Sequence, residues 1–413
     1  MRKTIRTFCT LILFSYFAVF FQNCSAGFQS GHLNASGSSN AVSGTPPSPS
    51  NPSIPIGDTA EMVPYKNAVN VTDDASLLAA ISNAKPGDGI LLAPGNYERI
   101  DVKNMQFADK VIIASKDPQN PANVRAVSIN GSKNVIIRYV SVHPYTDGSG
   151  IYIAGSDNIV IERLYVHGDM DGSPENDGAG MNSSTNTNLV VRNCEFRELK
   201  TGLSTQRGNN ILFTKNYFHE ISIDAMQVYW TSNITISKNY IADMITWNQA
   251  HKDGIQFFTS GQTTSAKNIT ITDNVFVRGK GQTVQGIFMG NESGVAYENV
   301  VISRNALIGP SWHGITIVIV NGLTMEDNLV QAYTDYQSWI KIGDTWGNMN
   351  IKNNHSTYFN LSDLKYGGEA EGYPEYDPVN NVSAPTLQIG DVSSLKAWQQ
   401  RIGNTVDENT FKQ

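Results

Sequence analysis

The stretches NITISKNYI, at residues 233–241, and NITITDNVF, at residues 268–276, decide the fold of this chain. Both begin with Asn and place apolar residues at alternate positions, the period-two pattern of a strand with one buried face. Because the two stretches are near-copies, they indicate a repeated unit in which each copy supplies one strand. Seven further copies begin at Asn134, Asn158, Asn188, Asn210, Asn299, Gly322 and Asn348.

The seventh position of the copies forms a column whose last six members are all Asn. An Asn amide can bond to the Asn directly above and below it, so a stacked column satisfies its own polar groups inside a solenoid. Asn also tolerates the left-handed backbone of a tight turn. We therefore predict an Asn ladder. The column is Val140, Leu164, Cys194, Asn216, Asn239, Asn274, Asn305, Asn328 and Asn354.

Neighbouring copies lie 22 to 35 residues apart. A coil of that length holds three short strands with turns and cannot close a core alone, so it must stack on its neighbours. In this repeat the chain resembles the right-handed parallel β-helix, the fold of pectate lyases (pectin-lyase-like proteins) and many other polysaccharide-active proteins. We expect this all-β domain at residues 61–360, followed by a C-terminal tail or cap at 361–413.

Both ends of the domain carry helix signals. Residues 73–92, DDASLLAAISNAKPGDGILL, predict an amphipathic helix from Asp74 to Ala84, a turn, and a strand through Ile90 to Leu92. This beginning also resembles the β-helix family, in which such a helix caps the open core and its strand edges. The sequence SSLKAWQQRI, around Trp398, predicts a second helix that covers the other end.

Residues 1–23 show a basic start and then a mostly apolar run of about 14 residues, the layout of a secretory signal and shorter than a membrane span. Cys24 resembles the lipidated cysteine of bacterial lipoproteins, and by that resemblance Ser25 favours the outer membrane. We expect a lipid-anchored protein of the cell envelope, with the Ser-, Gly- and Pro-rich residues 24–60 as a flexible tether. Ordinary secretion with cleavage near Ala26 is the alternative.

Composition removes several function classes. The chain has 30 Lys and Arg against 37 Asp and Glu, and this acidic balance argues against nucleic acid as a partner. Its three cysteines are too few for us to expect a disulfide framework. The sequence contains no phosphate-binding Gly loop, no HExxH pair and no GxSxG elbow, so it is not expected to be a kinase, a zinc protease or a serine hydrolase.

A second set of aligned positions lies at the start of each coil and consists of a small residue followed by an apolar one, as in Gly254-Ile255. With Ile255 inward, the neighbouring positions face outward and combine amides with aromatic rings, which suits an extended glycan because rings stack on sugar faces and amides bond hydroxyls. An ordinary solvated surface is the alternative. This outward row is Tyr152, Asn182, Ser204, Gln227, Gln256, Phe288 and Thr316, with Gln206, Tyr229 and Phe258 two residues further along.

Two further near-copies, DAMQ at 224–227 and HKDGIQ at 251–256, place Asp224 and Asp253 on adjacent coils, about 4.8 Å apart. Such carboxylates would share a proton, bind a cation such as calcium, or pair with a base. Capping of turns by both Asp residues is the structural alternative. The titratable and amide neighbours expected around the pair are His251, Lys252, Arg207, Gln285 and His313.

The acidic stretch HGDMDGSPENDGAG, at residues 167–180, offers Asp169, Asp171, Asn176 and Asp177 to a hard cation such as calcium. Its spacing does not match a known calcium loop. We therefore interpret it as an exposed turn.

The resemblance implies action on an acidic, uronate-containing polysaccharide. In related lyases and C5 epimerases, a base removes the proton beside the uronate carboxylate while a cation or basic side chain neutralises that carboxylate. By this resemblance Lys252 or His251 would be the base, Asp224 and Asp253 would hold a cation or orient the base, and Arg207 would pair with the substrate carboxylate.

Two other functions stay open. Stacked Asp residues could serve as acid and base in glycoside hydrolysis. A tethered, acidic solenoid is also what a rigid adhesin would look like, one that binds glycan or a partner cell through the same face without catalysis.

Overall fold

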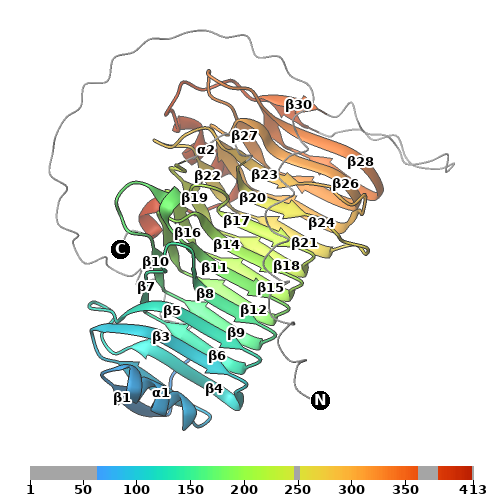
Figure 1. The fold of residues 1–413 in the computed structure, drawn as a ribbon. Helices are drawn as coiled ribbons and strands as arrows, with labels where there is room; N and C mark the ends of the chain where they lie inside the picture. Colours follow the sequence, from blue (N-terminus) through green and yellow to red (C-terminus); the bar gives the residue numbers. More distant parts are fainter. Residues whose placement is uncertain (1–62, 246–251, 361–379, 412–413) are drawn as a thin grey trace, which may run out of the picture. The chain divides into compact units, whose positions relative to one another are not determined.

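The computed structural model describes residues 63–245, 252–360 and 380–411. In these residues 31 strands join into one continuous parallel sheet that winds through successive coils. Figure 1 shows the strands as rungs that follow one another from β1 near the blue end of the colour bar to β30 near its red end. This is a parallel β-helix, as the repeat predicts.

Each complete coil contributes one strand to each of three stacks, which we number in chain order. The strands of stack 1 pair at fixed register, for example Gln227 beside Gln256. Stack 1 consists of β3 (Asn96–Lys103), β5 (Asn123–Asn130), β8 (Ser149–Ala154), β11 (Ala179–Ser184), β14 (Thr201–Gln206), β17 (Met226–Tyr229), β20 (Asp253–Phe258), β23 (Gln285–Met289), the first parts of β26 (Trp312–Glu326) and β28 (Ser338–Lys352), and β30 (Tyr358–Asn360).

Stack 2 holds the strands of the NITI-type repeat. Ile234 lies beside Ile269 and Ile236 beside Ile271, so the alternating pattern of the sequence becomes two apolar rows in the core. Stack 2 consists of β1 (Asn67–Val71), β2 (Asp88–Leu92), β4 (Gln106–Ser115), β6 (Lys133–Arg138), β9 (Asp157–Glu162), β12 (Thr187–Arg192), β15 (Asn209–Thr214), β18 (Ser232–Ser237), β21 (Lys267–Thr272), β24 (Tyr297–Ser303) and the later parts of β26 and β28.

Stack 3 is built from strands of only two or three residues. It returns the chain from the corner after stack 2, where the Asn column lies, to the next strand of stack 1. Stack 3 consists of β7 (Ser141–Val142), β10 (Tyr165–His167), β13 (Glu195–Arg197), β16 (Tyr217–His219), β19 (Tyr240–Ala242), β22 (Val275–Val277), β25 (Ala306–Ile308), β27 (Leu329–Gln331), β29 (His355–Ser356) and β31 (Val382–Ser383).

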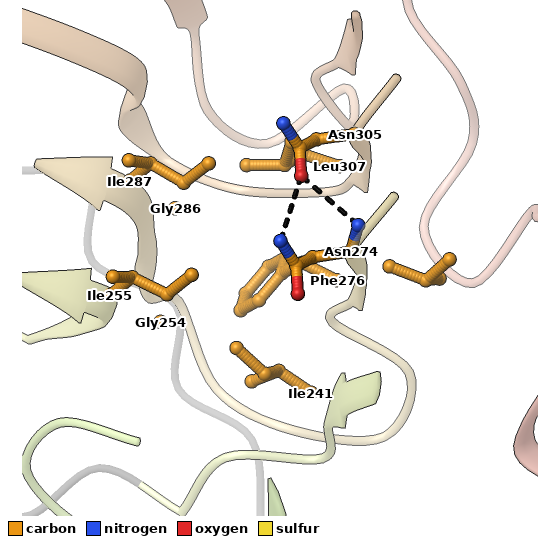
Figure 2. A pocket seen from close by; sticks show the side chains of 10 residues that line it. Ile241, Gly254, Ile255, Asn274, Phe276, Gly286, Ile287, Asn305 and Leu307 are labelled. Atoms are coloured by element: carbon orange, nitrogen blue, oxygen red, sulfur yellow. Dashed lines mark hydrogen bonds between the residues drawn. The ribbon is translucent and has the colours of Figure 1, made fainter. Parts of the chain in front are cut away.

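The predicted Asn ladder is present at the corner between stacks 2 and 3. Asn274 donates its backbone N–H and its Nδ2 to Asn305 Oδ1, each at 3.0 Å (Figure 2), and Nδ2 also donates to the Ile236 carbonyl at 2.9 Å. The pattern runs from Asn216 to Asn381, one coil further than the repeat predicts. Every buried amide in the ladder is therefore paired, which offsets the cost of placing it in the core.

The left-handed backbone expected at the ladder lies elsewhere. It falls on the residue just before each ladder Asn, such as Lys238 at φ 55° and Asp273 at φ 58°. It also falls on the first Asn of the repeat, such as Asn233 at φ 53° and Asn268 at φ 57°, where Asn268 Nδ2 donates to Asn233 Oδ1 at 2.7 Å. Asn is thus used twice per coil, once for hydrogen bonding and once for backbone conformation.

The N-terminal helix α1 (Asp74–Ser82) confirms the predicted cap. Asp73 and Ser76 form a capping box at its start. Leu77 and Ile81 are buried in the main core beside the first coil, and β2 follows after the predicted turn. Strand β1 precedes the helix and was not predicted.

The second helix, α2 (Ser393–Ile402), forms where the sequence predicts it but does not cover the end of the core. Trp398 packs with Ala306 and Leu329 on the outward side of stack 3. The chain then continues through a short 3-10 helix, Glu408–Thr410, so that Phe411 packs beside Tyr217. This segment covers the outward side of stack 3, whose apolar outward residues need a partner.

The expectations for the secretory signal, Cys24 and the tether lie outside the described residues. In the part of the chain that is described, no helix has the length and apolar character needed to cross a membrane. Cys194, the cysteine that this part contains, is a buried free thiol in the Asn column.

Candidate functional site

The structure brings Asp224 and Asp253 together at the start of stack 1, as the register predicts. Met226 pairs with Ile255, which places the two Asp residues side by side on adjacent coils. Asp224 Oδ1 accepts the backbone N–H of Asp253 at 2.7 Å. This bond is a turn-capping role, the structural alternative noted above, and it fixes the spacing of the two carboxylates.

The glutamines of the two near-copies complete the pair. Gln227 Nε2 donates to Asp224 Oδ2 at 2.7 Å. With its amide nitrogen turned toward the carboxylates, Gln256 donates to Asp224 Oδ2 at 3.1 Å and to Asp253 Oδ2 at 3.2 Å. Both Asp side chains are buried, at 1% and 0% exposure. Amide donors therefore surround this pair, and they stabilise its negative charge.

Lys252 precedes Asp253 and supplies the cationic group of the cluster. Its side chain is only 4% exposed. Burial lowers the pKa of Lys252 to about 8, and the negative charges of Asp224 and Glu175 partly oppose that shift. Because this pKa is well below that of an ordinary lysine, more of the Lys252 amine is neutral near neutral pH, which is what a general base requires.

The next coils continue the column with Gln285 and His313. Gln285 pairs with Asp253, and its Oε1 is buried without a hydrogen-bond partner among the described residues. His313 Nδ1 lies 2.8 Å from Thr316 Oγ1, and its ring meets Phe288 and Trp339 edge-on at 5.0 and 5.3 Å. His313 is thus held in one orientation by its neighbours.

The outward row of stack 1 exists as predicted, with each residue paired to its equivalent on the next coil. Tyr229 and Phe258 stack at 4.4 Å with their rings almost parallel, and Gln206 lies beside Tyr229. Tyr152 is the most open member at 45% exposure, whereas Gln256 is at 8%. The row thus offers both open aromatic surface and buried amides.

Arg207 is not brought to the Asp pair. It follows β14 and lies in the column of Trp230, six positions along stack 1 from Asp224, or about 20 Å. Its guanidinium lies 4.2 Å from the centre of the Trp230 ring, and Trp230 Nε1 donates to the Ser260 carbonyl at 2.9 Å. Sequence reasoning missed Trp230, although its place directly after Tyr229 in the repeat was a usable signal.

His251 lies outside the described residues, so its role stays a prediction.

The core behind the cluster leaves no room for a ligand. A cavity of about 10 Å³ lies beneath β20 and β23, lined by residues that include Ile255, Ile287 and Asn274 (Figure 2). A space of this size holds at most one water molecule. A Cβ at Gly286 would lie 2.2 Å from the Gly314 carbonyl oxygen, so the glycine column keeps the coils close. A substrate of this cluster must therefore bind on its outer side, away from the core.

Comparison with known proteins agrees with this architecture. Residues 125–285 match the family model described as "Right handed beta helix region". No curated protein sequence matches the chain. Two solved structures align at TM-scores of 0.51 and 0.50, and their low identities show a shared fold alone. The chain is a right-handed parallel β-helix.

The first of these structures is PfbA, a surface adhesin of Streptococcus pneumoniae, at 12% identity over 69% of this chain and 87% of that chain. The second is the A-module of the mannuronan C-5 epimerase AlgE4 from Azotobacter vinelandii, at 13% identity over 76% of this chain and 92% of that chain. An alginate lyase from Paenibacillus sp. str. FPU-7 aligns at 15% identity over 71% of this chain and 99% of that chain, with a TM-score of 0.44.

Proposed function

We propose that this protein acts on a uronate-containing polysaccharide by removing the proton beside the uronate carboxylate, with Lys252 as the base. The observation that carries the proposal is the buried Lys252 amine, with a pKa of about 8, next to Asp224 at the edge of a row of amides and aromatic rings. A base whose pKa lies near the working pH combines a useful unprotonated fraction with adequate basicity.

The proposed reaction begins when the neutral Lys252 amine takes the C5 proton of the sugar. The electron pair left on the substrate then follows one of two routes. It expels the oxygen at C4, which leaves with a proton from the Lys252 ammonium or from water and gives an unsaturated product, or it accepts a proton from water on the opposite face, which gives the C5 epimer. Asp224 holds the resulting ammonium by its charge, and the amides of Gln227 and Gln256 keep that carboxylate in place.

Arg207 takes a different part in this proposal from the one that the resemblance implies. At about 20 Å along the stack it cannot contact the sugar that Lys252 deprotonates. We assign Arg207 and the Trp230 ring beneath it to a more distant sugar of the same chain. His313, two coils from Asp253 in the same column, is our candidate for the carboxylate of the reacting sugar.

The test measures loss of the C5 proton, which occurs in both the elimination and the epimerisation. The full chain is mixed with a panel of polyuronates, and ultraviolet absorbance detects unsaturated products while NMR in D₂O detects exchange at C5. Lys252→Ala should lower either rate about 100-fold or more, because a general base typically contributes that factor. No reaction with any polyuronate of the panel, or an unchanged rate in Lys252→Ala, would overturn the proposal.

Lys200 provides the matched control. It occupies the column of Lys252 two coils earlier. Its carbonyl accepts the N–H of Ile223, and Ile223 occupies the position of Lys252 on the coil between them. The Lys200 side chain is exposed. Lys200→Ala removes a cation of the same kind from the same surface and should leave the rate within about twofold. An equal loss in both variants would indicate charge attraction of the polymer rather than a base.

A non-catalytic glycan-binding protein is the second candidate. It is favoured by the near-complete burial of both Asp carboxylates and by their amide donors, which suit a rigid structural role. In that case Lys252→Ala together with Asp253→Asn would weaken glycan binding only modestly. Glycoside hydrolysis ranks behind both functions, since it needs two carboxyl groups that flank the scissile bond, and these two instead accept hydrogen bonds from the Asp253 N–H and from the Gln227 and Gln256 amides.

A further inference from the structure

A second acidic cluster lies in the turn that joins stack 3 to stack 1. The connection between β10 and β11 contains Asp171, the short 3-10 helix Pro174–Asn176, and Asp177. Glu198 comes from the next coil, directly after β13, whose Arg197 pairs with His167. The fold therefore brings together carboxylates that are far apart in the sequence.

The three carboxylates meet at close range. One oxygen from each of Asp171, Asp177 and Glu198 lies within 4.8 Å of the other two. Asp177 and Glu198 are only 4% and 3% exposed. Gly168 provides the space, since a Cβ there would lie 2.2 Å from Asp177 Oδ2. The stretch that the sequence suggests is an exposed turn thus has a buried acidic interior.

Backbone groups of the loop hold one oxygen of each carboxylate. Asp177 Oδ1 accepts the N–H of Asp169 at 2.8 Å, Glu198 Oε1 accepts the N–H of Gly172 at 2.7 Å, and Asp171 Oδ1 accepts the N–H of Ser173 at 2.9 Å. Asp177 Oδ2 is left buried, with no hydrogen-bond partner among the described residues. These bonds orient the carboxylates and leave an oxygen of Asp177 for something the protein does not itself supply.

The cluster also lacks a balancing charge. In the described part of the chain, none of the three carboxylates forms an ion pair with Lys, Arg or His, and the neighbouring Arg197 is paired with Glu220. Burial raises the pKa of Asp177 and of Glu198, and the nearby negative charge of Asp171 adds to both shifts. Three such groups at this distance repel one another unless a cation lies between them.

We propose that Asp171, Asp177 and Glu198 bind one calcium ion, which ties the 169–177 loop to the following coil. Calcium takes carboxylate oxygens at about 2.3–2.6 Å, so ligands on opposite sides of the ion lie up to about 5 Å apart, which matches the observed separation. Magnesium would draw opposite ligands to about 4 Å and prefers to keep its waters. Loop carbonyls and water complete the coordination.

The calcium proposal does not rest on the proposed polysaccharide chemistry, although the two sites are neighbours. The Pro174 carbonyl lies 3.5 Å from Ser222 Oγ, just before Asp224, and the charge of Glu175 acts on Lys252. A calcium ion that holds the loop would therefore keep Glu175 in place beside the Lys252 amine.

The experiment is a calorimetric titration of the full chain, stripped with a chelator, with calcium chloride and in parallel with magnesium chloride. We expect one calcium ion per chain at this site, with at least tenfold weaker binding of magnesium. Asp177→Asn and Glu198→Gln should each weaken calcium binding at least tenfold. Asp169→Asn is the control: it changes an acid of the same loop that pairs with His143, and it should stay within about threefold.

Thermal unfolding gives a second readout with a distinctive sign. Without calcium, Asp177→Asn should unfold at a higher temperature than the unaltered chain, because it removes a buried uncompensated charge. With calcium the order should reverse. Calcium binding that is unchanged in both variants, equal binding of magnesium, or a destabilised Asp177→Asn protein in both conditions would each overturn the proposal.

Discussion

Two acidic clusters, which lie in the turns from stack 3 to stack 1 on successive coils, differ in how their charge is balanced. At the Asp224 and Asp253 pair, the chain itself provides a backbone N–H, two glutamine amides and a lysine. Around Asp177 and Glu198 the described chain provides backbone N–H groups but no cation. Because a buried charge must be compensated, Lys252 supplies a compensating cation at the first cluster, whereas the second cluster, which forms no ion pair in the described chain, implies a ligand.

The largest effect should come from removing a carboxylate from the cluster that contains Lys252. Asp224→Ala leaves the Asp253 N–H and the Gln227 amide without their acceptor beside Lys252, so we expect a loss of about 3 kcal/mol in unfolding free energy. Asp177→Ala in calcium-free buffer should cost far less, because it also relieves repulsion. Urea unfolding of both variants measures the difference, and equal losses would remove the contrast.

A methyl group at Gly168 should disturb the second cluster from the outside. The added Cβ would lie 2.2 Å from Asp177 Oδ2 and 2.0 Å from the Glu198 carbonyl oxygen, so both must move. We expect Gly168→Ala to destabilise the protein by about 2 kcal/mol and to abolish stabilisation by calcium. Melting temperatures with and without calcium check this expectation.

Gly172→Ala is the control for the Gly168 change. It meets no atom within 4 Å, and its only penalty is the φ of 84°. It should cost about 1 kcal/mol and keep the calcium response. A normal response in Gly168→Ala would show that the cluster does not need its present geometry.

The two clusters should also give opposite dependences of stability on pH. The pKa of Lys252 falls from 10.5 to about 8 on folding, so between these values the unfolded chain binds more protons and stability rises with pH. The folded pKa values of Asp177 and Glu198 are raised above the unfolded values of 3.8 and 4.5, so without calcium the folded chain binds more protons between the two values. The stability that these protons contribute is lost as pH rises through the folded pKa values. Each slope is at most about 1.4 kcal/mol per pH unit per group.

Unfolding of Lys252→Met and of Asp177→Asn across the pH range measures these slopes. Lys252→Met should remove the slope of stability against pH only in the alkaline range, and Asp177→Asn should reduce it only in the acidic range. A slope that persists at high pH in Lys252→Met would assign that titration to another group.

The smallest effect is expected at Arg207. If it holds a distant sugar against the Trp230 ring, Arg207→Ala should raise KM about threefold on long substrates and leave kcat within about twofold. Steady-state kinetics on long and short oligosaccharides tests this, with short ones unaffected. A large fall in kcat would place Arg207 at the reacting sugar instead.

Most of the fold could be predicted because each coil repeats the same local pattern. The Asn column, the helix at Asp74 and the strand register all appear in the structure at the expected residues. The left-handed positions were assigned to the wrong column, since both columns contain Asn and the sequence does not separate its two uses. The packing place of α2 was missed because no repeat relates Trp398 to stack 3.

The sequence by itself determined the stacked coils and the neighbours within one column, such as Asp224 and Asp253, because a repeat of known register converts distance along the chain into contact. Only the tertiary structure decided which groups meet across different turns. It separated Arg207 from the pair, buried Lys252 and lowered its pKa, and brought Glu198 to Asp177. The path of the irregular connections sets these contacts, and no periodic signal encodes that path.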